Sequence, residues 1–291
     1  MQEKYTTLYA ITILLLLTVI SSSFFFPTAN GQQRLPVLLI HGYLNDKSVW
    51  NDWVVDLKAL GFNVKAVEFN GNDKCGSAAD HAEQLRNIVE DFKTSTESDK
   101  INIVGHSKGG LDARVYLAND LGNDDIANLI MIGTPNAGSP RAENRDLEVI
   151  NNANKICSPF PDQAINDLIP GAAATEVKKN VHTQYHTIAG DWKAIFDGGM
   201  FISTLIPTPP FGILVWTLVW TLIDNDCIDD VAIVTYQFDG SIEIDGPDDG
   251  IVPLESIESG EFNSIGHTDN CHTNLFSDEE FDKAMTILGR Q

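Results

Sequence analysis

The stretch that decides the fold runs from Lys100 to Arg114 and reads KINIVGHSKGGLDAR. Its first half carries Ile101, Ile103 and Val104, the apolar β-formers typical of a buried strand. A glycine-rich turn and a run with helical character follow. At such a corner the serine hydroxyl is exposed beside a helix N-terminus, where negative charge is favoured. The order strand, turn, helix therefore predicts Ser107 as a nucleophile; the alternative is a tight turn that happens to contain serine.

Strands and helices alternate on both sides of this corner. The pattern predicts strands at 36–40, 62–69, 127–135 and 184–191, and helices at 50–60, around 85–92 and at 278–288. A hairpin is expected to turn at Asp239-Gly240, and 151–180 has an irregular pattern. This alternation predicts a parallel sheet with helices on both faces.

The first 31 residues have the pattern of a secretory signal. Lys4 precedes an apolar stretch from Leu8 to Phe26, and Ala29 and Gly31 are spaced for cleavage before Gln32. The alternative is an uncleaved N-terminal anchor, since the stretch approaches the length that spans a bilayer. Either reading places residues 32–291 outside the cytoplasm as one domain.

Composition narrows the class of partner. The 291 residues carry a net charge of -22, which repels nucleic acid and anionic headgroups. Four cysteines in an exported chain predict two disulfides, for which three connectivities are possible. The sequence contains no Cys-x-x-Cys pair that would indicate a zinc site. These cysteines are Cys75, Cys157, Cys227 and Cys271.

A serine nucleophile requires a base and a carboxylate, and in this architecture they follow it in the order Asp or Glu, then His. We prefer Asp249, because Gly250 and two apolar residues follow it, and keep Asp248 as the alternative. We prefer His272, because it precedes the final helix, and keep His267 as the alternative.

An attacked carbonyl becomes an oxyanion, which two backbone N–H groups stabilise. One donor is expected at Lys108, directly after the serine. The other is expected at Tyr43, in the loop after the first strand, where Gly42 leaves room. His41 is expected to shape this loop.

Together these residues resemble the α/β-hydrolase superfamily, and within it the secreted triacylglycerol lipases and esterases. The motifs are VLLIHGY (37–43), IVGHSKGGLDAR (103–114), IMIGTPNAGS (130–139), TIAGD (187–191), DDGIVPLES (248–256) and CHTNL (271–275). The resemblance implies a mostly parallel central sheet flanked by helices. It also implies a Ser107-Asp249-His272 triad with the amides of Tyr43 and Lys108 as the oxyanion hole.

The chain departs from such lipases in two places. Lys108 stands where Met or Gln is commoner, and we expect its cation near the cleft. Lid or insert material is expected in 141–182 and 192–245, where 198–223 has no charged residue. Phe211, Trp216 and Trp220 would line an acyl-binding lid; the alternatives are a buried core element and a membrane-embedding element.

We therefore predict an extracytoplasmic serine hydrolase that cleaves carboxylic esters with lipid-like acyl chains and makes transient contact with a lipid interface. The alternatives are an acyltransferase or amidase with the same triad, and a non-catalytic surface binding protein. No cofactor is expected, with structural calcium near Asp269 as the alternative suggested by the resemblance. Acyl-chain length and oligomeric state are left open.

Overall fold

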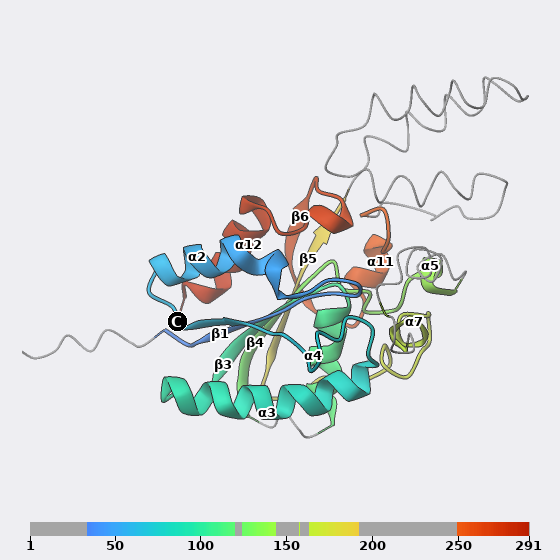
Figure 1. Cartoon of the computed structure of the whole chain (residues 1–291). Helices are drawn as coiled ribbons and strands as arrows, with labels where there is room; N and C mark the ends of the chain where they lie inside the picture. Colours follow the sequence, from blue (N-terminus) through green and yellow to red (C-terminus); the bar gives the residue numbers. More distant parts are fainter. Residues whose placement is uncertain (1–33, 120–123, 144–156, 158–162, 192–248, 291) are drawn as a thin grey trace, which may run out of the picture. The chain divides into compact units, whose positions relative to one another are not determined.

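The computed structural model describes residues 34–119, 124–143, 157, 163–191 and 249–290 (Figure 1). Their strands form one sheet in the order β2-β1-β3-β4-β5-β6, and every neighbouring pair is parallel. The strands are β1 (Val37–Ile40), β2 (Val64–Ala66), β3 (Ile101–His106), β4 (Ile126–Ile132), β5 (Gln184–Gly190) and β6 (Asn263–Thr268). The predicted parallel sheet between helices is confirmed.

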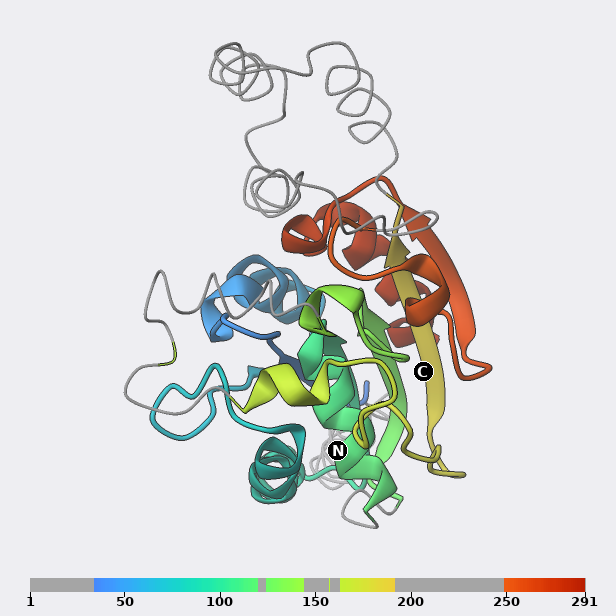
Figure 2. The same cartoon turned by 90° about the vertical axis from the view of Figure 1, so that its right-hand side faces the viewer.

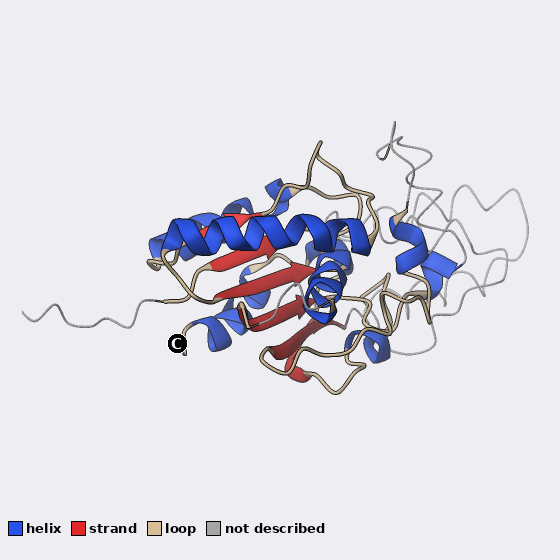
Figure 3. Cartoon of the chain, turned by 90° about the horizontal axis from the view of Figure 1, so that it is seen from below, coloured by secondary structure: helices blue, strands red, loops and turns tan. Residues whose placement is uncertain are grey.

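Helices cover both faces of this sheet, as Figures 1 and 3 show. On one face lie α3 (Ala78–Thr96) and α4 (Lys108–Ala118); on the other lie η1 (Lys47–Trp50), α2 (Asn51–Ala59) and α12 (Asp278–Leu288). Four further short helices are α5 (Pro140–Glu143), α7 (Ala164–Asp167), α11 (Leu254–Ile257) and η3 (His272–Asn274).

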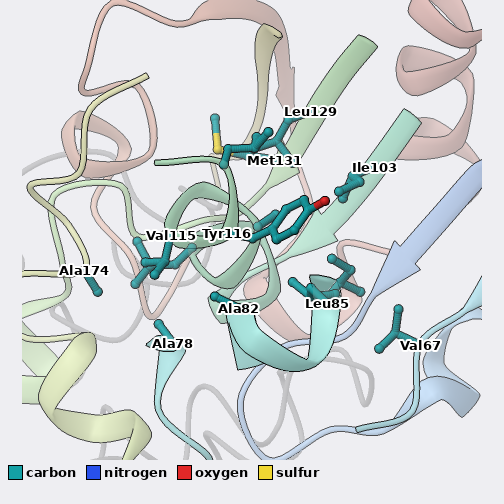
Figure 4. Close-up of a cluster of buried hydrophobic side chains, with 14 of the residues drawn as sticks. Val67, Ala78, Ala82, Leu85, Ile103, Val115, Tyr116, Leu129, Met131 and Ala174 are labelled. Atoms are coloured by element: carbon teal, nitrogen blue, oxygen red, sulfur yellow. The ribbon is translucent and has the colours of Figure 1, made fainter. Parts of the chain in front are cut away.

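Two hydrophobic cores result, because successive residues of a strand point to opposite faces. Leu38 and Ile40 of β1 join the core under α3 and α4, whereas Val37 and Leu39 join the core under α2 and α12. Figure 4 shows part of the first core, in which Tyr116 lies among aliphatic side chains from β3, β4 and α3. With both faces covered, the central strands are largely apolar, although β3 also carries Asn102 and His106 and β4 carries Asn128.

The final strand differs from this pattern. In β6 most residues are exposed or half-buried, and the strand lies at the sheet edge beside β5 (Figure 2). The sequence pattern does not predict this strand, since the segment from Asn263 to Thr268 is largely polar. The predicted hairpin at Asp239-Gly240 and the uncharged stretch 198–223 lie outside the described residues.

A disulfide links two distant parts of the described chain. Cys75, before α3, is bonded to Cys157, with their Cα atoms 5.7 Å apart. Cys271, next to η3, is also disulfide-bonded. Among the helices of the described residues, none combines the length and apolar character needed to cross a membrane.

Candidate active site

Ser107 sits at the corner between β3 and α4 in a strained conformation. Its φ of 52° and ψ of -128° are unusual for a residue with a side chain. Two close approaches make the corner possible: a Cβ on Gly105 would lie 2.6 Å from the Gly110 nitrogen, and one on Gly109 would lie 2.5 Å from the His41 oxygen. Larger residues at these two positions would therefore push the helix away from the strand.

His272 is brought to this serine from the far end of the chain. Its Nε2 lies 2.8 Å from Ser107 Oγ, within hydrogen-bond distance. It begins η3, and its backbone N–H donates to the Asp249 carbonyl oxygen at 2.8 Å. A serine hydroxyl in this contact can donate its proton to a neutral imidazole.

Asp249 contacts the other ring nitrogen of His272. Its Oδ2 lies 2.7 Å from His272 Nδ1, while its Oδ1 accepts from the N–H groups of Ile251 and Val252 at 3.0 and 2.7 Å. The carboxylate is fully buried. A Cβ on Gly190 would lie 2.7 Å from the Asp249 Cβ, so the end of β5 leaves the space for it. The two oxygens have separate tasks: one is fixed by the backbone and the other faces the imidazole.

Glu280 of α12 holds the loop that carries His272. Its Oε2 accepts from the Ser277 backbone N–H at 3.0 Å in a capping box, and its Oε1 accepts from Asn270 Nδ2 at 2.9 Å. The side chain is fully buried. Sequence reasoning missed this role, although Ser277-x-x-Glu280 is a recognisable capping-box pattern.

His106, the residue before the serine, was also missed. Its Nε2 lies 3.0 Å from the carbonyl oxygen of His272, so the ring donates to it from Nε2–H. Burial lowers the pKa of His106 well below its ordinary value, and the neighbouring His272 lowers it further. His106 is therefore neutral, and this fixes its proton on Nε2.

The two segments that carry the expected oxyanion donors meet at Ser107. A Cβ on Gly42 would lie only 2.8 Å from the Ser107 Cβ, which shows how closely the loop after β1 approaches the serine. Tyr43 follows in that loop, and Lys108 begins α4.

The expectation that the Lys108 cation lies near the cleft is wrong. Its side chain is 1 % exposed and its Nζ donates to Asp112 Oδ1 at 2.6 Å. The carboxylate four residues along the same helix draws the side chain inward under α4.

The other candidates lie elsewhere. His267 is on β6, where its exposed ring contacts Glu258 Oε1 at 2.9 Å. Asp269 is exposed, and the described residues contain no group of three or more His, Cys, Asp or Glu side chains placed to hold a metal ion. Asp248, Phe211, Trp216 and Trp220 lie outside the described residues, as do 144–156, 158–162 and 192–245 of the expected inserts.

Comparison with known proteins identifies the family of the chain. The family model described as palmitoyl protein thioesterase matches residues 36–194. Triacylglycerol lipases of Pseudarthrobacter phenanthrenivorans and Burkholderia plantarii are both 31% identical over 116 residues, which is 38% of this chain. The match spans 36% and 32% of those two relatives, about a third of their length.

A solved structure shares the fold. The mature form of the Bacillus licheniformis lipase BlEst2 superposes with a TM-score of 0.61 at 18% identity, and covers 88% of this chain and 92% of its own. The predicted resemblance to α/β-hydrolase lipases and esterases is confirmed, and these matches support the class of carboxylic ester hydrolase.

Proposed function

This chain belongs to the palmitoyl protein thioesterase family, and from that premise we propose that it hydrolyses fatty-acyl esters through Ser107, His272 and Asp249. The single observation that carries the proposal is the continuous row of hydrogen-bond contacts from Ser107 Oγ through both ring nitrogens of His272 to Asp249 Oδ2. The row combines a nucleophile, a base and an orienting carboxylate in the order that acyl transfer requires.

The proposed reaction has two halves. Ser107 Oγ attacks the acyl carbonyl carbon as His272 Nε2 takes the hydroxyl proton, and the carbonyl oxygen becomes an oxyanion that accepts from the amides of Tyr43 and Lys108. The C–O bond to the leaving alcohol then breaks, and His272 returns the proton to that alcohol. Water next attacks the acyl-enzyme with His272 again as base, which releases the acid and restores the serine.

Asp249 acts on the histidine rather than on the substrate. Its Oδ1 accepts from two backbone N–H groups, so the carboxylate is held with Oδ2 towards His272 Nδ1. It therefore keeps the Nδ1–H tautomer, in which the unprotonated Nε2 accepts the serine proton, and it stabilises the imidazolium that forms.

A fatty-acyl group is what the two kinds of relative share. The matched family is named for palmitoyl thioesters, and the curated relatives are named for triacylglycerols. Both substrates present a long acyl chain to the serine. The same attack releases either an alcohol or a thiol, so thioester hydrolysis is the second candidate. The two reactions differ in the leaving group, which is an alcohol for an oxygen ester and a thiol for a thioester. We propose the oxygen ester first because the structural neighbour that matches over most of its length is a lipase.

We also propose that the domain works outside the cytoplasm. Cys75–Cys157 and the bonded Cys271 support this, because disulfides persist mainly in oxidising compartments. Its strong negative charge, -22, fits a small-molecule or lipid substrate better than nucleic acid.

The test is a series of nitrophenyl esters of rising acyl length, with an S-palmitoyl peptide as the thioester arm. Turnover should rise with chain length, and Ser107→Ala should lower kcat by about 10⁴-fold or more. Ser139→Ala is the matched control, since Ser139 is a buried serine whose Oγ donates to the Ile251 carbonyl. Unchanged turnover in Ser107→Ala would overturn the proposal.

A further inference from the structure

Two charged side chains and a histidine are buried together beside the helix that follows Ser107. Lys108 and Asp112 of α4 are each 1 % exposed and His81 of α3 is 2 % exposed. Asp112 accepts from Lys108 Nζ through Oδ1 at 2.6 Å and from His81 Nδ1 through Oδ2 at 2.7 Å. We call these three residues the α4 charge cluster.

The proton positions in this cluster follow from its distances. Lys108 Nζ also lies 3.2 Å from His81 Nδ1. A ring nitrogen that donates to Asp112 cannot accept from Lys108, so the shorter contact is the hydrogen bond. Each oxygen of Asp112 thus accepts from a different residue, and the carboxylate is clamped between two helices.

Such a cluster is costly to bury, because each buried ion loses several kcal/mol of hydration, roughly, before its partners compensate. Burial by itself would raise the pKa of Asp112, but Lys108 and His81 outweigh burial and the pKa lies below its ordinary value. Two more acids face the cluster: Asp73 Oδ2 lies 3.5 Å from His81 Nε2, and Asp167 of α7 accepts from the Ala78 N–H at 2.6 Å. The cation of Lys108 is therefore held among carboxylates, away from the serine.

Aromatic contacts connect the cluster to the loop after β1. The His81 ring stacks on Phe69 at 3.7 Å between centroids, and Phe69 meets His41 edge-on at 5.5 Å. His41 in turn lies with Nδ1 2.9 Å from the Gly42 carbonyl oxygen. A series of contacting side chains thus leads from Lys108 to His41. His41 in turn contacts the backbone of Gly42, the residue before Tyr43.

We propose that the α4 charge cluster is a positioning element that sets the spacing between the backbone N–H groups of Lys108 and Tyr43. This inference rests on the proposed function, which assigns those two groups to the oxyanion. Oxyanion donors act at about 2.7–3.1 Å, and a misplacement of about 1 Å can cost on the order of 10²-fold in rate. Lys108 is the residue through which the cluster acts, because its backbone lies beside Ser107 and its side chain is fixed to Asp112.

The test compares Lys108→Met with the wild type in three measurements: kcat, KM, and the Ki of an alkyl trifluoromethyl ketone. The ketone forms a tetrahedral adduct with the serine, so its Ki reports on the oxyanion site. We expect kcat to fall and Ki to rise by a similar factor of about 10 or more, with KM changed by less than about 3-fold. Lys93→Met, which breaks the Lys93–Asp125 pair elsewhere on α3, is the matched control and should leave all three unchanged.

A second variant separates positioning from stability. Lys108→Met/Asp112→Leu removes both charges, and apolar replacement of a buried ion pair often preserves stability. It should remain folded, with an unfolding temperature lowered because the buried His81 Nδ1 loses its acceptor, yet keep the loss in kcat. Wild-type kcat and Ki in this folded double variant would overturn the inference alone. A wild type that neither turns over esters nor binds the ketone would overturn the proposed function and this inference with it.

Discussion

His106 Nε2 lies 3.0 Å from the carbonyl oxygen of His272, so the residue before the serine also fixes the backbone of the histidine that contacts it. The two rings lie 4.9 Å apart. This contact connects the end of β3 to the loop before α12. It thereby helps to set the distance between His272 Nε2 and Ser107 Oγ.

Removing the His106 ring should therefore lower the activity, because the backbone of His272 would lose this contact. In His106→Ala we expect kcat to fall by about 10-fold and stability by about 1–3 kcal/mol, since a buried carbonyl loses its donor. In His106→Gln, whose amide can donate to the same carbonyl, part of the rate should return. Because His106 is neutral, the pH–rate profile should keep its shape.

Steady-state kinetics and urea unfolding measure both effects. His186→Ala is the control, since His186 is a half-buried histidine on β5 whose Nε2 lies 3.3 Å from Asn128 Oδ1. Equal kcat values for His106→Ala and the control would contradict the positioning role of His106.

The ionisation of Asp112 should make part of the free energy of unfolding depend on pH in the acid range. Its folded pKa lies below the ordinary 3.8 because Lys108 and His81 outweigh its burial. As the pH falls the unfolded chain takes up this proton first, so the stabilisation is present above about pH 4 and is lost as the pH drops through the folded pKa. Asp112→Asn should cost about 3 kcal/mol at pH 6 and clearly less at pH 3.

Urea unfolding of the two proteins at several pH values measures this difference. Asp125→Asn, which alters the more exposed pair with Lys93, should show a much smaller cost at pH 6. A cost for Asp112→Asn that stayed constant from pH 6 to pH 3 would mean that Asp112 is not ionised in the folded protein.

The Cys75–Cys157 disulfide should contribute strongly to stability. It joins residues 82 positions apart, and closing a loop of that length restricts the unfolded chain by about 4 kcal/mol. The double variant Cys75→Ala/Cys157→Ala should lose an amount of that order, measured by urea unfolding under non-reducing conditions. Wild-type stability in this variant would refute the prediction.

Local patterns made much of this fold predictable. The final helix was expected at 278–288 from its amphipathic pattern and is α12 (Asp278–Leu288). The corner at Ser107 was predictable for the same reason, since a strand, a glycine turn and a helix follow one another in sequence. Signals that lie within a dozen residues can be read without the tertiary structure.

Features that depend on distant partners could not be read in this way. Lys108 was expected near the cleft, yet its side chain points to Asp112, whose buried position also depends on His81 from another helix. Pairing of Cys75 with Cys157 needed the fold, because four cysteines allow three connectivities. Strand β6 is polar and was missed, since only its pairing with β5 makes it a strand.

The most direct test of the central claim compares two histidines only five positions apart in sequence. His272 Nε2 contacts Ser107 Oγ, whereas His267 Nε2 contacts Glu258 at the surface. We predict that His272→Ala lowers kcat/KM for a nitrophenyl ester by about 10⁴-fold or more, while His267→Ala stays within about 3-fold of wild type. A large loss in His267→Ala with activity retained in His272→Ala would contradict the account.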